Sequence, residues 1–161
     1  MQDIIDECGI SRGGIYLYFS SVDEIFLELM KQRNKQPVPT NEPFEIVMAD
    51  YFSRQKRRLL NFENSLFRAY CEYIFSKPKA AVESFRDIQF GQLRKTVLSI
   101  LMLGVKQGAI RDENILQLAD HIIVTIDGLS VLALAEALTE EMINEQIFML
   151  NGLIKRIKDG A

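Results

Sequence analysis

Hydrophobic residues in this chain recur mostly every three or four positions, which is the spacing of one face of an α-helix. No segment shows the strict apolar-polar alternation of a half-buried strand. The pattern predicts an all-α fold, with helices at about residues 2–8, 12–19, 22–35, 44–60, 63–76, 79–107, 113–138 and 140–158.

The clearest interruption of this pattern is a stretch with three prolines in seven residues, Pro37-Val38-Pro39-Thr40-Asn41-Glu42-Pro43. Proline clusters between periodic segments are typical of connections. The sequence therefore predicts a small head at residues 1–36 and a larger helical domain at residues 44–161.

The head contains three helix signals in close succession. Gly9 is suited to end the first helix, and Ser11 is suited to cap the second. Ser21 and Glu24 have the spacing of a capping box at the start of the third. Helices joined by such short, glycine-containing turns are typical of a helix-turn-helix.

The short middle helix of the head contains two glycines, which each cost about 1 kcal/mol of helix propensity relative to alanine. Gly13 and Gly14 would suit a surface where the backbone approaches DNA closely. Tyr16 and Tyr18 can reach phosphates through their hydroxyls, and Arg12 can reach a phosphate or a guanine. The alternative is a short core helix whose tyrosines only pack.

These residues together resemble the DNA-binding signature of the TetR/AcrR family of transcriptional repressors. The resemblance covers about 30 residues and rests on Ile4, Ile5, Cys8, Gly9, Ile10, Ser11, Gly13, Ile15, Tyr16, Tyr18, Phe19 and Ser21. It implies a helix-turn-helix head, followed by a helical domain that binds an effector and dimerises. It also implies that the DNA-binding residues are Ser11, Arg12, Gly13, Gly14, Tyr16, Tyr18 and Ser21.

Two features depart from the family pattern. Val22 stands where family members usually have a lysine that holds a phosphate. The family also places another helix before the one that contains Ile4, so we expect this chain to be short at its N-terminal side. Residues 1–36 carry four basic side chains against six acidic ones, an unfavourable balance for binding DNA.

The segment 113–138 is apolar on nearly every side, and such a helix must be covered on every side. Asp120, Asp127 and Glu136 argue against insertion into a membrane. The simplest cover is a second copy, so that this helix and the segment 140–158 form a four-helix dimer interface. The alternative is a monomer that encloses the helix by itself. The predicted interface residues are Ile122, Ile126, Leu129, Leu132, Ile147, Leu150 and Ile154.

The middle helices are rich in adaptable apolar side chains, which can line a pocket for a small apolar or aromatic effector or can equally form plain core. Tyr70, His121 and Asp127 are the candidate polar anchors of such a pocket. The predicted pocket residues are Tyr51, Phe52, Phe67, Tyr70, Phe85, Met102, His121 and Asp127.

No metal-ligand spacing, phosphate loop or nucleophile motif is present, so we expect no metal, no cofactor and no enzyme activity. The two cysteines, which are far apart in sequence, and a polar, acidic N-terminus favour the cytoplasm. We expect a ligand-responsive repressor that acts as a homodimer on palindromic double-stranded DNA. The alternative is a dimeric small-molecule binding or scaffold protein whose head does not bind DNA.

Overall fold

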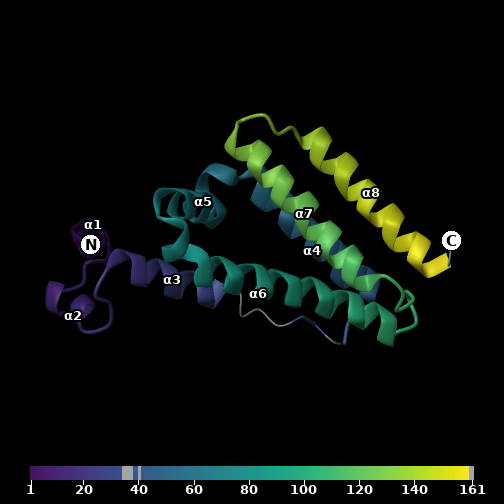
Figure 1. Ribbon diagram of the computed structural model, residues 1–161, viewed down its shortest axis with the longest axis horizontal. Helices are drawn as coiled ribbons and strands as arrows, with labels where there is room; N and C mark the ends of the chain where they lie inside the picture. Colours follow the sequence, from purple (N-terminus) through teal and green to yellow (C-terminus); the bar gives the residue numbers. More distant parts are fainter. Residues whose placement is uncertain (34–37, 40, 160–161) are drawn as a thin grey trace. The chain divides into compact units, whose positions relative to one another are not determined.

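A computed structural model describes residues 1–33, 38–39 and 41–159, with the side chains of all these residues except 33, 64 and 157–159. The chain divides into two compact units, Met1–Gln36 and Pro37–Ala161. The predicted proline-rich connection at 37–43 and the last residues of the predicted head lie partly outside the described residues. Throughout the described ranges the regular elements are helices and no strand is present, which confirms the all-α prediction (Figure 1).

The first unit contains α1 (Gln2–Cys8), α2 (Arg12–Tyr16) and α3 (Val22–Arg33). Its buried apolar side chains come one from each helix, namely Ile5, Ile15 and Met30. The helix-turn-helix arrangement predicted for this segment is thus built around one small core.

The turns of the head are held by backbone conformation and by serine caps. Gly9 ends α1 with a φ of 62°, and the N–H of Ile10 donates to the carbonyl of Ile5 at 3.3 Å. The Ser21 hydroxyl accepts from the N–H of Glu24 at 3.1 Å, as predicted. The Glu24 carboxylate, however, accepts from the N–H and hydroxyl of Ser20 rather than from Ser21, so the predicted capping box is shifted by one residue.

The second unit begins with α4 (Phe44–Leu60), which Pro43 precedes. The predicted helix at 63–76 is divided into a 3-10 turn, η1 (Phe62–Asn64), and α5 (Leu66–Ser76). The division falls at Ser65, whose hydroxyl caps α5 by accepting from the N–H of Arg68 at 3.3 Å. The long α6 (Lys79–Lys106) follows directly after Pro78.

The connection from α6 to α7 (Ile115–Leu134) differs from the prediction at one point. Gly108 adopts a φ of 69°, and the N–H of Ala109 donates to the carbonyl of Gly104, which ends α6 close to the predicted residue. Asp112 is not the cap of the next helix. Asn114 occupies that position in a left-handed conformation, with a φ of 63° and no side-chain cap, so α7 begins two residues later than predicted.

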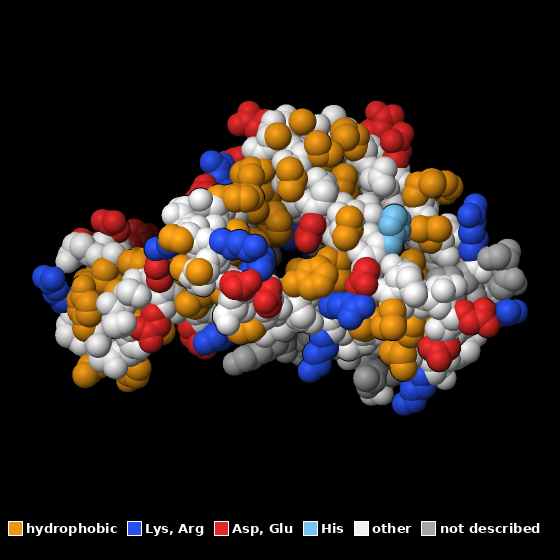
Figure 2. Space-filling view, in the orientation of Figure 1, with side chains coloured by type: hydrophobic (Ala, Val, Ile, Leu, Met, Phe, Trp, Pro, Cys, Tyr) orange, Lys and Arg blue, Asp and Glu red, His pale blue; other side chains and the backbone are white. Residues whose placement is uncertain are grey.

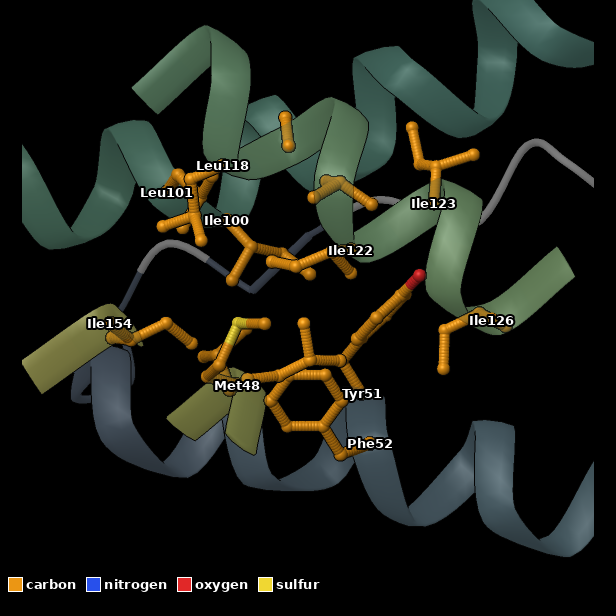
Figure 3. Close-up of a cluster of buried hydrophobic side chains, with 14 of the residues drawn as sticks. Met48, Tyr51, Phe52, Ile100, Leu101, Leu118, Ile122, Ile123, Ile126 and Ile154 are labelled. Carbon is orange, nitrogen blue, oxygen red and sulfur yellow. The ribbon is translucent and has the colours of Figure 1, made fainter. Parts of the chain in front are cut away.

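The second unit has one continuous core between α4, α6, α7 and α8 (Glu140–Asp159). α6 packs along α7, while α4 contacts α6, α7 and α8. Figure 3 shows Met48, Tyr51 and Phe52 of α4 facing Ile100 and Leu101 of α6 and Ile122, Ile123 and Ile126 of α7. This core fixes the relative positions of the helices that carry the candidate sites.

Polar contacts also join these helices to one another. The Gln107 amide accepts from the N–H of Phe44 at 2.8 Å and donates to the carbonyl of Glu42 at 2.9 Å. Arg94 of α6 pairs with Asp120 of α7 through two bonds of 2.6 and 3.0 Å. The first of these contacts fixes the start of α4 against the end of α6, and the second joins α6 to α7.

The residues predicted for the dimer interface are largely inside the subunit. Ile122, Ile126, Leu129, Leu150 and Ile154 are all buried in the core of the second unit, and Leu132 and Ile147 pack partly against it. We therefore revise that prediction, because side chains already covered by their own chain cannot also face a second copy. Hydrophobic periodicity could not show which face of α7 points outward, because this helix is apolar on both sides.

The outer side of α7 is the apolar face that remains exposed. Exposed residues at helical spacing along this side are Gln117, His121, Val124, Gly128 and Val131, and Ala135 follows directly after the helix. The corresponding stripe on α8 contains Glu141, Glu145, Phe148 and Gly152. Figure 2 shows the single histidine at the surface, with hydrophobic side chains on either side. By length and composition alone α7 could also span a membrane, a property that it shares with core helices of soluble proteins.

Candidate functional sites

The head exposes the side chains that the sequence assigned to DNA contact. Tyr16 is 47% exposed and Tyr18 is 78% exposed, so neither tyrosine belongs to the small core. The guanidinium of Arg12 lies 5.9 Å from the centre of the Tyr16 ring, which holds the two groups together on one surface. The alternative in which these tyrosines only pack inside the head does not match their exposure.

The two glycines of α2 have different structural roles. A Cβ atom at Gly13 would meet nothing within 4 Å, so nothing inside the head requires a glycine there. A Cβ atom at Gly14 would lie 3.0 Å from the Ser11 hydroxyl, which accepts the N–H of Gly14. Gly14 therefore serves the cap, whereas Gly13 leaves a bare stretch of backbone beside Arg12 and Tyr16.

Ser11 and Ser21 both contribute to the head by capping. Each hydroxyl accepts a backbone N–H three residues further on, which positions α2 and α3. The bonds that Ser20 donates to Glu24 lower the pKa of that carboxyl group. This lowered pKa favours the negatively charged form of Glu24, which follows Tyr16 and Tyr18 in the sequence by eight and six residues.

In the second unit, aromatic rings form a chain of contacts from η1 through α5 to α6. Ring centres lie 5.9 Å apart for Phe62 and Phe67, 5.7 Å for Phe67 and Tyr70, and 5.8 Å for Tyr70 and Phe85. Tyr73 approaches Phe85 edge-on at 5.6 Å. Figure 2 shows the surface hollowed between α5, α6 and α7, where these elements come together.

Arg58 of α4 places a positive charge against this aromatic cluster. Its guanidinium carbon lies 5.0 Å from the centre of the Phe67 ring, and its Nη2 donates to the Ser130 hydroxyl at 3.1 Å. Ser130 is fully buried and donates in turn to the carbonyl of Ile126 at 2.9 Å. Arg58 is thus anchored to α7 by a hydroxyl that is itself fixed.

Asp127 completes the polar centre. Burial raises the pKa of its carboxyl group, and the charge of Arg58 opposes that rise. The buried Tyr51 has its pKa raised to about 12, first by burial, while Arg58 acts in the opposite direction and Asp127 adds to the rise. Burial followed by the Asp127 charge also raises the pKa of Tyr70 and of Cys71. A ligand here would meet the charge of Arg58, the carboxyl group of Asp127 and the phenol of Tyr70 among aromatic rings.

The structure therefore brings together five of the predicted pocket residues, namely Tyr51, Phe67, Tyr70, Phe85 and Asp127. It does not bring Met102 or His121 to this place, because both side chains are exposed. Phe52 lines a different feature, a groove between α4 and α8. These three assignments are corrected accordingly.

Arg58 was not among the predicted pocket residues, because it stands in the basic run Arg54-Gln55-Lys56-Arg57-Arg58, and such runs are typical of a solvated helix face. Its spacing from Tyr51 could have indicated that its side chain points toward the interior. Arg58 follows the buried Tyr51 by seven residues, which is two helical turns, so the two lie on one face. Within the described residues, no cluster of histidine, cysteine, aspartate or glutamate side chains could hold a metal ion.

Comparison with known proteins finds a similarity in the head. Residues 1–29 match the model for bacterial regulatory proteins of the tetR family. A segment of 31 residues is 52% identical to an uncharacterized HTH-type transcriptional regulator, YfiR, of Bacillus subtilis strain 168. That alignment covers 19% of this chain and 15% of the relative's length. No solved structure matches the chain.

Proposed function

We infer that this chain, a member of the tetR family of bacterial regulatory proteins, is a ligand-responsive transcriptional repressor that acts as a homodimer on a palindromic operator. The observation that carries the proposal is the exposed surface formed by Arg12, Gly13, Tyr16 and Tyr18 inside the matched segment. Such a regulator works on DNA in the cytoplasm, and the match to regulatory proteins agrees with the expectation that the chain is not an enzyme.

On DNA, each part of this surface has a distinct task. The Tyr16 and Tyr18 hydroxyls contact phosphates, which position the head without reading sequence. Arg12 provides either a phosphate contact or a bidentate contact to guanine in the major groove. Gly13 lets the backbone of α2 approach closely, since no side chain stands between it and the duplex.

The dimer is built from the exposed faces of α7 and α8. Val124 and Val131 are 64% and 59% exposed, and Phe148 is 77% exposed. Gly128 and Gly152 lie in the same two stripes, where small residues allow helices to approach closely. Two helices from each copy would form a four-helix interface that covers these side chains.

The effector site is the aromatic cluster around Arg58, Asp127 and Ser130. A small aromatic molecule with a polar substituent would stack on Phe67, Tyr70 and Phe85, while its substituent exchanges hydrogen bonds with Arg58 or Asp127. Because these residues come from α4, α5, α6 and α7, a ligand there would shift helices of both the core and the proposed interface.

Regulation follows from geometry. Two recognition helices must lie about 34–36 Å apart to enter successive major grooves on one face of DNA. A ligand that changes this separation by shifting the helices of the second unit would weaken binding to DNA. A coupling of about 1–3 kcal/mol, or roughly five- to 150-fold in affinity, is sufficient.

The test is a titration of the full chain against labelled DNA at several salt concentrations. Palindromes near the gene should bind more tightly than random DNA of the same length. Arg12→Ala and Tyr16→Phe should weaken this binding, with the fold checked by circular dichroism, while Lys95→Ala on the exposed side of α6 should not. Equal affinity for palindromic and random DNA would refute the repressor function.

Two observations favour the alternative, a dimeric small-molecule binding or scaffold protein whose head does not bind DNA. The head has six acidic against four basic side chains, and Val22 replaces the phosphate-holding lysine at the start of α3. This alternative is supported if Arg12→Ala and Tyr16→Phe both leave the protein's affinity for DNA unchanged while the protein remains dimeric.

A further inference from the structure

A groove with a volume of about 430 Å³ runs between α4 and α8, away from the Arg58 cluster. Its floor is apolar and is formed by Phe44, Met48, Phe52, Ile110, Ile147 and Ile154. Pockets of about 300–1,000 Å³ with apolar walls and a few polar groups are the usual form of small-molecule sites. This groove has that size and that composition.

The groove is elongated because α4 and α8 run in opposite directions along it. Lys56, near the end of α4, pairs with Glu140 and Asn144 at the start of α8. Phe44, at the start of α4, lines the groove together with Ile154, near the end of α8. The twelve steps along the helix from Phe44 to Lys56 span about 18 Å at 1.5 Å per residue. A molecule that follows this floor is therefore long and narrow.

The polar side chains along the groove are mostly engaged within the protein. Ser53 donates to the carbonyl of Ala49, Asn151 donates to the carbonyl of Ile147, and Lys56 is held by Glu140 at 2.7 Å. Lys155 also lines the groove, and it has no ion pair among the side chains that the structure describes. The antiparallel register places this cation at the end of the groove near Phe44 and Glu45.

We propose that the groove between α4 and α8 binds a linear amphipathic molecule with one anionic head group, whose head pairs with Lys155 and whose apolar tail lies along Phe44, Met48, Phe52 and Ile147. The charge at Lys155 selects an anion over a cation. This site is separate from the proposed effector cluster and does not depend on binding to DNA.

Isothermal titration of the full chain with decanoate, decanol and decylammonium below their aggregation concentrations tests the charge preference. We expect decanoate to bind once per chain and at least about tenfold more tightly than the other two. Lys155→Gln should weaken decanoate binding about five- to tenfold. Arg156→Gln, which removes a neighbouring exposed cation outside the groove, should leave it unchanged. Equal affinities for the three amphiphiles, or equal effects of the two variants, would overturn the proposal.

A second pair of variants tests the location. Ala49 is exposed and lines the groove, so Ala49→Phe fills it without altering the buried core. Ile46 lies on the same helix, is 56% exposed and is outside the groove, so Ile46→Phe is the matched control. We expect loss of decanoate binding only in Ala49→Phe, with both variants melting like the parent. Retained binding in Ala49→Phe would show that decanoate binds elsewhere and that the groove is not the site. Neither result bears on operator binding.

Discussion

Gly104 of α6 faces the ring of Phe44 so closely that a Cβ atom at position 104 would lie 2.8 Å from Cδ2 of that ring. Phe44 has little freedom to withdraw, because its ring is 3% exposed and its N–H is bound to the Gln107 side chain. The start of α4 and the end of α6 therefore meet at a distance that only glycine permits.

Gly104→Ala should consequently destabilise the protein by about 1–3 kcal/mol, through overpacking against Phe44. Gly91→Ala on the same helix is the control, since a Cβ atom there would meet nothing within 4 Å. The control should gain up to about 1 kcal/mol from its better helix propensity. Urea unfolding followed by circular dichroism measures both. Equal stabilities of the two variants would contradict the close packing.

Gly13→Ala should separate folding from binding in the head. The added methyl group has open space, so the variant should melt no lower than the parent. Its affinity for operator DNA should fall about tenfold, or about 1.4 kcal/mol, because the methyl group holds the backbone of α2 away from the duplex. Fluorescence anisotropy and thermal melting give the two quantities. Unchanged affinity would remove Gly13 from the proposed interface.

Gly14→Ala is a useful comparison for that experiment. Its Cβ atom would press against the Ser11 hydroxyl, which caps α2. We expect this variant to lower both the melting temperature and the affinity for DNA, because the cap and the position of α2 change together. Gly13→Ala should therefore lower only the affinity for DNA, whereas Gly14→Ala should lower both the affinity and the melting temperature.

Asp127→Asn should alter how stability depends on pH. Burial raises the pKa of Asp127 in the folded chain above its ordinary value of 3.8, so the folded state holds this proton more tightly than the unfolded state. In the parent, the protonated Asp127 contributes its full stabilisation of the folded state below about pH 3.8. This contribution is lost as the pH rises through the raised pKa. The variant stays neutral, so its melting temperature relative to the parent should increase from acidic to neutral pH. A difference that is constant with pH would contradict this.

Val124→Lys and Val131→Asp should convert the proposed dimer to a monomer. Both side chains are more than half exposed in the single subunit, so the subunit itself should fold normally. Ile46→Lys is the control, because Ile46 is similarly exposed on α4 but lies outside both stripes. Sedimentation equilibrium across a range of concentrations measures the effect. A parent chain that remains monomeric at every concentration would refute the interface.

Much of the helix pattern could be predicted from local chemistry. The bounds of α4 were predicted correctly because Pro43 precedes a strongly amphipathic run. The start of α7 was not, because Asp112 looked like a cap whereas the chain turns through a left-handed Asn114, a conformation that sequence spacing does not reveal. Glu24 met Ser20 instead of Ser21 for a similar reason, since a cap depends on local geometry within one residue.

The candidate sites were less accessible to prediction. Tyr51, Tyr70 and Asp127 were chosen for their chemistry, and the fold does group them, but Arg58 was hidden in a basic run. The groove was not anticipated, because α4 and α8 are separated by the rest of the second unit and nothing local links them. The sequence thus indicated three members of the cluster through their chemistry, but it did not indicate a groove that forms only when α4 and α8 meet.

The apolar character of α7 on every side means that hydrophobicity alone does not specify how this helix is rotated about its axis. Turning it would exchange buried isoleucines such as Ile122 for exposed valines such as Val124 with little change in apolar burial. The orientation must then be set by directional bonds to neighbouring helices, such as those of Arg94 with Asp120 and of Arg58 with Ser130. Loosening either bond would permit alternative rotational states of α7 before it unfolded the protein.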